Sequence, residues 1–188
     1  PKMTSILQHL ADNVLPNLPP KDNRSFFFDL TDPAKRSKED ILEVLKVISR
    51  FQSYAETTLG LNYNETLQVC ETLGLATGDK SEDSLKKMAT EIRRHLEIAC
   101  VVAHPVDSAA CATKDGSWWS EGPFTDNPKI TTGAGDHFNA GFCAARLSGF
   151  SPLSSLALAT CTSGHYVRTA ESPTTNQVIE LLKQQDSL

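Results

Sequence analysis

Long apolar runs are absent from this sequence. No apolar stretch approaches the ~18 residues that a membrane-spanning helix requires. The N-terminal residues "PKMTSILQHLADNV" lack the apolar centre of a secretory signal peptide. We therefore expect no membrane among the partners of this protein.

Positive charge and paired cysteines are also scarce. The formal net charge is -5 and no basic stripe is present, which argues against a nucleic-acid partner. The five cysteines are odd in number and show no zinc-binding spacing. Most of them lie in apolar segments, so we expect buried, reduced thiols in a cytoplasmic protein.

Helical and strand patterns alternate along all 188 residues. This alternation predicts one α/β domain with a largely parallel sheet. Helices are expected at residues 2–14, 38–52, 63–73, 82–96, 137–148, 152–167 and 174–185, and strands at 25–30, 54–62 and 99–104, followed by a hairpin at 107–122. Ser37 and Ser81 are expected to cap two of these helices, Gly74 to end a third, and Asp115–Gly116 to form the hairpin turn.

Glycine is used sparingly, yet two glycines and an aspartate are packed into Thr132–Asp136, within "KITTGAGDHFNAGF". Gly133 and Gly135 permit backbone angles closed to other residues and let a ligand approach the main chain. If a helix begins near His137, the preceding amides can hold an anion at its positive end, and Asp136 can take a proton from an attacking hydroxyl. The alternative is structural: Asp136 is the N-cap and the glycines serve the turn.

The stretch Asn62-Tyr63-Asn64-Glu65 has a similar ambiguity. An asparagine followed three residues later by a glutamate is typical of a helix capping box. The functional alternative is a pair of oxygen ligands at a strand exit that hold a magnesium ion through waters. Neither this stretch nor the glycine turn decides between its two readings by itself.

The two motifs together resemble a known family. "TTGAGDHFNAGF" resembles the second signature of the PfkB (ribokinase-like) carbohydrate kinases, and "NYNE" occupies the place of that family's N-x-x-E element. The stretches "FFFDLTDPAKR" upstream and "YVRTAESPT" downstream also agree with this family, so the resemblance covers essentially the whole chain. It implies a three-layer α/β/α ribokinase-like sandwich with a mostly parallel sheet. Only the C-terminal, ATP-side part of that fold is matched, so the N-terminal portion and the lid are missing.

The resemblance also implies an ATP-dependent kinase that transfers the terminal phosphate to a sugar hydroxyl, with sugar and nucleotide as partners. Asp136 is then the catalytic base, and Asn62 and Glu65 support the Mg²⁺ that accompanies ATP. The amides of Gly133, Ala134 and Gly135 form the anion hole, and the nucleotide-binding residues are Thr132, Gly133, Gly135, Thr160 and Ser163. His137 follows Asp136 directly, which raises the question of an acid–base pair. Adjacent residues at a helix start point in different directions, so His137 is expected to have a structural role instead.

The sequence departs from the family pattern at the nucleotide side. The family's T-x-G-x-x-G loop reads "AHPVDS" here, and Pro105 has no amide to offer a phosphate. The aspartate that usually precedes the signature is Ile130, which puts a monovalent-cation site in doubt, and a common asparagine aligns with Thr160.

These departures leave an alternative function open. The chain is either the incomplete C-terminal part of a sugar kinase, inactive when isolated, or a catalytically degenerate ribokinase-like module for nucleotide binding or assembly. A hydrolase built on Asp136 and His137 is poorly supported, because no nucleophile motif accompanies them. An uncovered apolar edge or helix face would favour a homodimer or other self-association.

Overall fold

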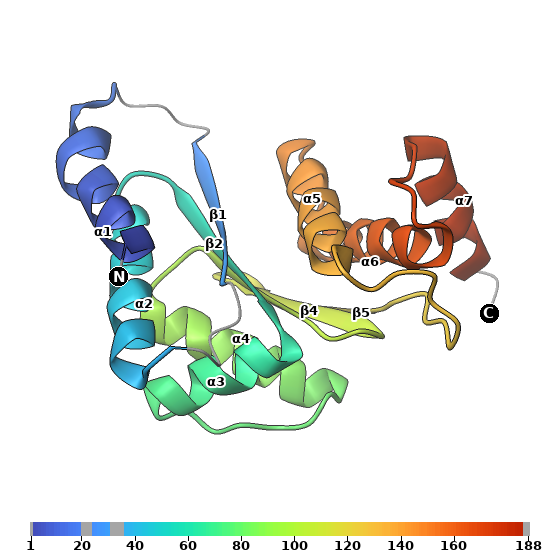
Figure 1. The fold of residues 1–188 in the computed structure, drawn as a ribbon, viewed down its shortest axis with the longest axis horizontal. Coiled ribbons are helices and arrows are strands. Elements are labelled where there is room, and N and C mark those ends of the chain that lie inside the picture. The colour runs from blue at the N-terminus through green and yellow to red at the C-terminus, as the bar shows by residue number, and fades with distance from the viewer. Residues whose placement is uncertain (1, 20–23, 31–35, 186–188) are drawn as a thin grey trace. The chain divides into compact units, whose positions relative to one another are not determined.

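A computed structural model describes residues 2–19, 24–30 and 36–185 (Figure 1). The chain divides into two compact units. The first comprises Pro1–Ala103 and Ala112–Ser117, and the second comprises His104–Cys111 and Trp118–Leu188. Within the described ranges, no helix is both long enough and apolar enough to cross a membrane.

Strands and helices alternate as the sequence predicts, which confirms the α/β fold. The strands are β1 (Ser25–Asp29), β2 (Glu56–Asn62), β3 (Cys100–His104), β4 (Ser108–Thr113) and β5 (Gly116–Glu121). They form one five-stranded mixed sheet in the order β1-β2-β3-β4-β5, in which β1 pairs parallel to β2 with Phe27 opposite Thr58. The turn between β4 and β5 is Lys114–Asp115, one residue earlier than predicted, because Gly116 already belongs to β5.

Helices account for most of the remaining chain. They are α1 (Lys2–His9), the π-helical turn η1 (Leu10–Val14), the 3-10 turn η2 (Leu15–Asn17), α2 (Lys38–Phe51), α3 (Tyr63–Leu73), α4 (Glu82–Leu96), α5 (Ala134–Leu147), α6 (Pro152–Thr169) and α7 (Thr175–Gln185). The predicted N-terminal helix over residues 2–14 is therefore present, but its second half has π geometry and it continues as a 3-10 turn.

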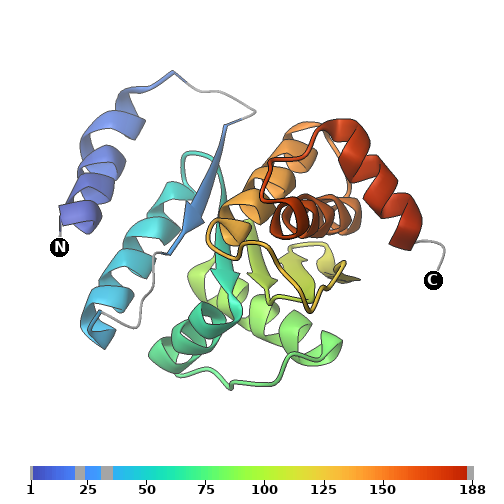
Figure 2. The ribbon, with the colours of Figure 1, turned by 45° about the vertical axis from the view of Figure 1, so that its right-hand side comes forward.

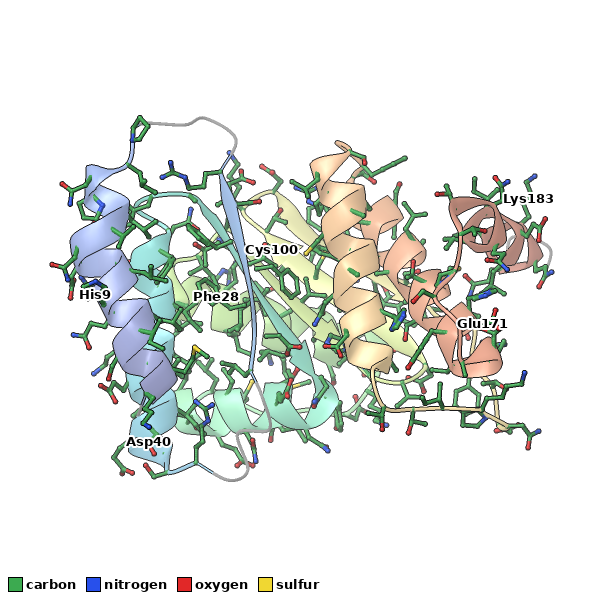
Figure 3. The ribbon with its side chains drawn as sticks, turned by 45° about the horizontal axis from the view of Figure 1, so that its top comes forward. His9, Phe28, Asp40, Cys100, Glu171 and Lys183 are labelled. Atoms are coloured by element: carbon green, nitrogen blue, oxygen red, sulfur yellow. The ribbon has the colours of Figure 1, made fainter. Side chains whose placement is uncertain are left out.

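The aromatic strand β1 contributes to the core of the first unit. Phe26 and Phe28 pack against a buried cluster of α2 and the N-terminal helical segment, and each ring meets Phe51 edge to face, at centroid distances of 5.0 and 4.9 Å (Figure 3). The phenylalanines of β1 are only partly buried.

Local signals set most helix ends of the first unit. Ser37 caps α2 by accepting a hydrogen bond from the Asp40 amide, and Gly74 ends α3 in the left-handed conformation, both as predicted. Ser81 precedes α4, but its side chain does not cap it, because the hydroxyl donates to Asp79 instead. One apolar face of α4 is buried, so that helix is positioned by packing more than by its cap. Its residues are Leu85, Met88, Ala89, Ile92 and Leu96.

The second unit is built around α5 and α6, which pack closely against each other, with α7 against α6 (Figure 2). The close approach depends on Gly141: a Cβ placed there would lie 3.0 Å from Ala159 Cα. α5 begins at Ala134, three residues earlier than the expected start at His137. This shift changes the position of every residue in the glycine turn relative to the helix.

Candidate functional site

The turn before α5 ends in a glycine that the backbone requires. Gly133 is the N-cap of α5 and has a φ of 89°, a left-handed conformation that residues with a side chain rarely adopt. Asp136 is therefore the third residue of the helix, and the interpretation of Asp136 as the N-cap is wrong. Its carboxylate does not satisfy the start of α5, so the fold gives it no capping role.

The first turn of α5 leaves two amides open. The Ala134 amide donates to the Thr131 carbonyl at 3.1 Å, and the His137 amide donates to the Gly133 carbonyl at 3.1 Å. In the part of the chain that the structure describes, the amides of Gly135 and Asp136 have no acceptor. Such amides, at the positive end of a helix, are suited to an anion.

This arrangement differs from the predicted anion hole, because one of its three amides is not available and a further one is. The prediction named the amides of Gly133, Ala134 and Gly135, but the Ala134 amide is already used inside the turn. The open donors of the first helical turn are those of Gly135 and Asp136. The reason is that the helix starts earlier than expected, which brings Ala134 into hydrogen-bonding distance of Thr131.

Gly135, unlike Gly133, is not required by the backbone. It lies inside the first turn of α5, and a Cβ placed there would meet only His104 Cε1, at an ordinary contact distance of 3.7 Å. An alanine would therefore fit the protein itself. The glycine makes physical sense if a ligand approaches the main chain at this point.

The Asp136 side chain is exposed at the same turn. Of the residues that the structure describes, none hydrogen-bonds its carboxylate. A carboxylate at the positive end of a helix remains available to accept a proton from a hydroxyl brought close to it.

Two of the predicted nucleotide-binding residues of α6 occupy different surroundings. The Ser163 hydroxyl donates to the Ala134 carbonyl at 3.0 Å, so it lies at the turn. Thr160 is buried, its hydroxyl donates to the Ala157 carbonyl of its own helix, and its Cβ lies near Gly122. The structure thus brings Ser163, and not Thr160, to the glycine turn, whereas Thr132 is part of the turn and exposed.

His104, at the end of β3, is a neighbour of the turn that the sequence did not single out. Its ring stacks on Phe138 of α5 at a centroid distance of 4.5 Å. Burial lowers the pKa of the His104 imidazole to about 4, so the ring is neutral near pH 7. Its Nε2 is buried and has no hydrogen-bond partner among the described residues. The only signal in the sequence was a polar residue closing the apolar strand "CVVAH".

The other candidate site, Asn62 and Glu65, lies in the first unit. Asn62 Oδ1 accepts from the Glu65 amide at 3.0 Å, and Glu65 Oε2 accepts from the Asn62 amide at 2.8 Å, which is a complete capping box of α3. Glu65 is 6% exposed, whereas Asn62 is exposed.

These two side chains do not form a closed cage for a metal. Within the described segments, no group of three or more His, Cys, Asp or Glu side chains could hold an ion. Magnesium, however, keeps several waters and takes few protein ligands when it is bound with phosphates. The oxygen donors of Asn62 and Glu65 therefore fit an ion held through water, and the capping role does not exclude it.

Solved structures identify the fold of this chain. Ribokinase from Thermotoga maritima superposes with a TM-score of 0.65 and 19% identity, covering 94% of this chain and 52% of that one. A phosphofructokinase-2 mutant from Escherichia coli gives 0.66 and 13%, covering 97% and 62%, and a nucleoside kinase from Methanocaldococcus jannaschii gives 0.61 and 21%, covering 87% and 49%. The chain has the fold of about half of a ribokinase-like kinase.

Sequence comparison identifies the family more narrowly. The family model for prokaryotic ketohexokinases matches residues 1–185, and the chain belongs to that family within the PfkB (ribokinase-like) kinases. Ketohexokinase from Haloferax volcanii is 25% identical over 180 residues, which cover 95% of this chain and 46% of that protein. The chain thus spans less than half the length of this relative.

Proposed function

We propose that this chain carries the catalytic base and the phosphate-binding turn of an ATP-dependent ketohexose kinase. The observation that supports this most directly is the first turn of α5, where the unpartnered amides of Gly135 and Asp136 adjoin the exposed Asp136 carboxylate. Membership of the prokaryotic ketohexokinase family favours a ketohexose as the acceptor.

The proposed reaction is a direct phosphoryl transfer. A sugar hydroxyl attacks the terminal phosphorus of ATP, the bond from that phosphorus to the bridging oxygen breaks, and ADP leaves. Asp136 accepts the hydroxyl proton, and the Gly135 and Asp136 amides neutralise charge on the transferring oxygens. Bound Mg²⁺ would supply further charge neutralisation on the phosphates, held through waters by Asn62 and Glu65.

The first test is the Asp136→Asn variant. We expect turnover to fall by ~10²–10⁴ with little change in ATP affinity, because the substitution removes a base and leaves the amides in place. The assay uses Mg-ATP and a panel of ketoses and aldoses, with the reading frame extended upstream of Pro1 and, separately, with the 188-residue chain. An unchanged rate in Asp136→Asn would remove Asp136 from the mechanism.

The chain alone is expected to bind phosphate or nucleotide weakly and to phosphorylate no sugar. Holding an acceptor in line with ATP can contribute ~7–11 kcal/mol to lowering a barrier, and the chain spans 46% of the length of the ketohexokinase relative. Rapid phosphorylation of a ketose by the 188-residue chain would show that it contains the whole active site.

A second test separates the kinase from a degenerate binding module. Glu65→Gln keeps a side-chain oxygen that can accept from the backbone N–H of Asn62, so it preserves the capping box. The substitution removes the negative charge. If Glu65 supports Mg²⁺, the thermal stabilisation by Mg-ATP should shrink in this variant while its melting temperature without ligand stays close to that of the wild type. A wild-type chain that Mg-ATP does not stabilise would favour an assembly module without nucleotide.

A further inference from the structure

Three successive carbonyls in the glycine turn each accept a hydrogen bond from a side chain. Tyr166 Oη donates to the Thr132 carbonyl at 3.0 Å, His137 Nδ1 lies 2.8 Å from the Gly133 carbonyl, and Ser163 Oγ donates to the Ala134 carbonyl at 3.0 Å. Because a carbonyl accepts only, His137 Nδ1 carries the hydrogen of its bond. The donors come from α6 and from the first turn of α5, so side chains outside the turn hold its carbonyls one by one.

The carbonyls determine where the amides point. A trans peptide unit is planar, and the C=O of one residue and the N–H of the next point in opposite directions. Holding the carbonyls of residues 132, 133 and 134 therefore fixes the N–H groups of Gly133, Ala134 and Gly135. Backbone hydrogen bonds from the Ala134 and His137 amides also hold this turn, and the side-chain donors add to them at positions where glycine gives the chain extra freedom.

We propose that Tyr166, His137 and Ser163 are positioning residues that hold the peptide planes of the glycine turn, so that the open Gly135 amide stays aimed at a phosphate. This inference rests on the proposed function, because it assumes that the turn receives the transferring phosphoryl group. Donors that are oriented before the ligand arrives need no reorganisation during the reaction, which is the main source of their stabilising effect.

The positioning residues are themselves held in place. The rings of His137 and Tyr166 stack at a centroid distance of 3.6 Å and an interplanar angle of 12°. The other ring nitrogen of His137, Nε2, lies 2.9 Å from Ser172 Oγ in the segment between α6 and α7. Both rings therefore have one fixed orientation, and the hydrogen bonds to the turn follow from it.

A second observation points to a ligand at the same turn. His104 Cε1 lies 3.7 Å from the Cβ position of Gly135, and the buried Nε2 of the same ring is without a partner in the described part of the chain. A buried polar atom without a partner is uncommon, and a ligand or an ordered water at Gly135 would place a hydrogen-bonding group near it.

Two substitutions of His137 separate positioning from packing. The amide nitrogen of asparagine falls near the place of Nδ1, and that of glutamine falls near the place of Nε2. His137→Asn can therefore keep the donor to Gly133, whereas His137→Gln can keep only the contact with Ser172. Both lose the stacked ring, so a role in packing alone predicts the same result for both.

The experiment titrates the 188-residue chain with inorganic phosphate and follows the backbone amides of Gly133, Gly135 and Asp136 by NMR. We expect His137→Asn to bind phosphate nearly as well as the wild type. His137→Gln and Tyr166→Phe, which keeps the ring and loses one hydroxyl, should bind roughly three- to tenfold more weakly, the effect of one neutral hydrogen bond. Their Gly133 and Ala134 amide shifts should also differ from the wild type before phosphate is added.

The outcomes separate this inference from the proposed function. Equal phosphate affinity in His137→Asn, His137→Gln and Tyr166→Phe would overturn the positioning role and leave the kinase proposal unaffected. Variant-dependent phosphate binding, together with no sugar phosphorylation by the upstream-extended protein, would support positioning and overturn the kinase. A wild-type chain whose Gly135 and Asp136 amides do not respond to phosphate would overturn both.

Discussion

Gly133 and Gly135 stand two residues apart and need to be glycine for different reasons. Gly133 has a φ of 89°, so the turn itself requires it. Gly135 is helical, and the nearest atom to its Cβ position is 3.7 Å away, so the fold tolerates a larger residue. The backbone therefore requires glycine at position 133 and not at position 135.

Alanine substitutions at the two positions should therefore differ in their effects on the free energy of unfolding and on phosphate binding. Gly133→Ala is expected to lower the free energy of unfolding by about 1–2 kcal/mol, because a left-handed conformation is costly for alanine. Gly135→Ala should leave it unchanged or raise it by up to about 1 kcal/mol, since alanine is the better helix former, yet it should weaken phosphate binding. Urea unfolding and phosphate titration of both variants measure this. Wild-type phosphate affinity in Gly135→Ala would mean that no ligand approaches there.

His104 predicts a dependence of stability on pH. Its pKa in the folded chain is about 4, below the ordinary value of 6.5, because burial disfavours the charged ring. The unfolded chain therefore binds more protons between these values, and stability is lost as the pH falls from about 6.5 towards 4. The loss between pH 7.5 and 5 should amount to about 2 kcal/mol.

The variant that isolates this effect is His104→Phe, which keeps an aromatic ring on Phe138 and removes the titrating group. Urea unfolding at pH 7.5 and 5 should show a smaller loss in His104→Phe than in the wild type. Removal of the exposed His95 serves as the matched control. The same loss in wild type and His104→Phe would show that His104 is not the source of the dependence.

At the scale of elements, the packing of α5 on α6 is what gives the turn its shape. The residues that contact the carbonyls of the turn lie 29 to 34 positions further along the chain, on α6, or on α5 itself. Helix α6 must lie close to α5 for these hydrogen bonds to form. That closeness depends on small residues, because a Cβ at Gly141 would lie 2.9 Å from Thr162 Cβ and 3.0 Å from Ala159 Cα.

Gly141→Ala is therefore expected to destabilise the chain even though it lies in a helix. Alanine gains about 1 kcal/mol in helix propensity, but overpacking against a backbone atom costs about 1–3 kcal/mol and should prevail. The separation of α5 and α6 should also change the Gly133 and Gly135 amide shifts at the turn. Gly135→Ala, the same substitution in the same helix without a clash, is the control. An increase in stability in Gly141→Ala would mean that the helices can move apart freely.

At the scale of the whole molecule, exposed apolar side chains gather where α5 leads into α6. Leu147 is 76% exposed, Phe150 49% and Leu153 48%, all within a short stretch of the second unit. Large exposed apolar side chains that lie near one another favour association.

Self-association should therefore depend on the exposed apolar residues Leu147, Phe150 and Leu153. We expect light scattering to give a mass above the 20.5 kDa monomer, rising with concentration. The double variant Leu147→Lys and Leu153→Lys should lower the mass towards that of the monomer, since it replaces apolar surface by charge. Ser148→Lys adds a charge beside the same apolar residues and keeps all three of them, so it should change the measured mass less. A monomeric wild type at all concentrations would refute the association.

The sequence by itself determined the features that depend on neighbouring residues. The capping box of Asn62 and Glu65, the end of α3 at Gly74 and the buried stripe of α4 all follow from short spacings, and the structure confirms them. The glycine signature likewise indicated the family, because its residues are contiguous. These features need no knowledge of the rest of the chain, since their hydrogen bonds and faces form within a few residues.

Only the tertiary structure decided how the glycine turn is arranged. α5 starts at Ala134, and the Ala134 amide donates to the Thr131 carbonyl. Asp136 therefore lies in the first helical turn instead of at the N-cap. The tertiary structure also brought Tyr166 to the carbonyl of Thr132 and stacked the His104 ring on Phe138. These contacts join residues more than thirty positions apart, and a local pattern has no means of indicating them, because they depend on how closely α5, α6 and the end of β3 pack.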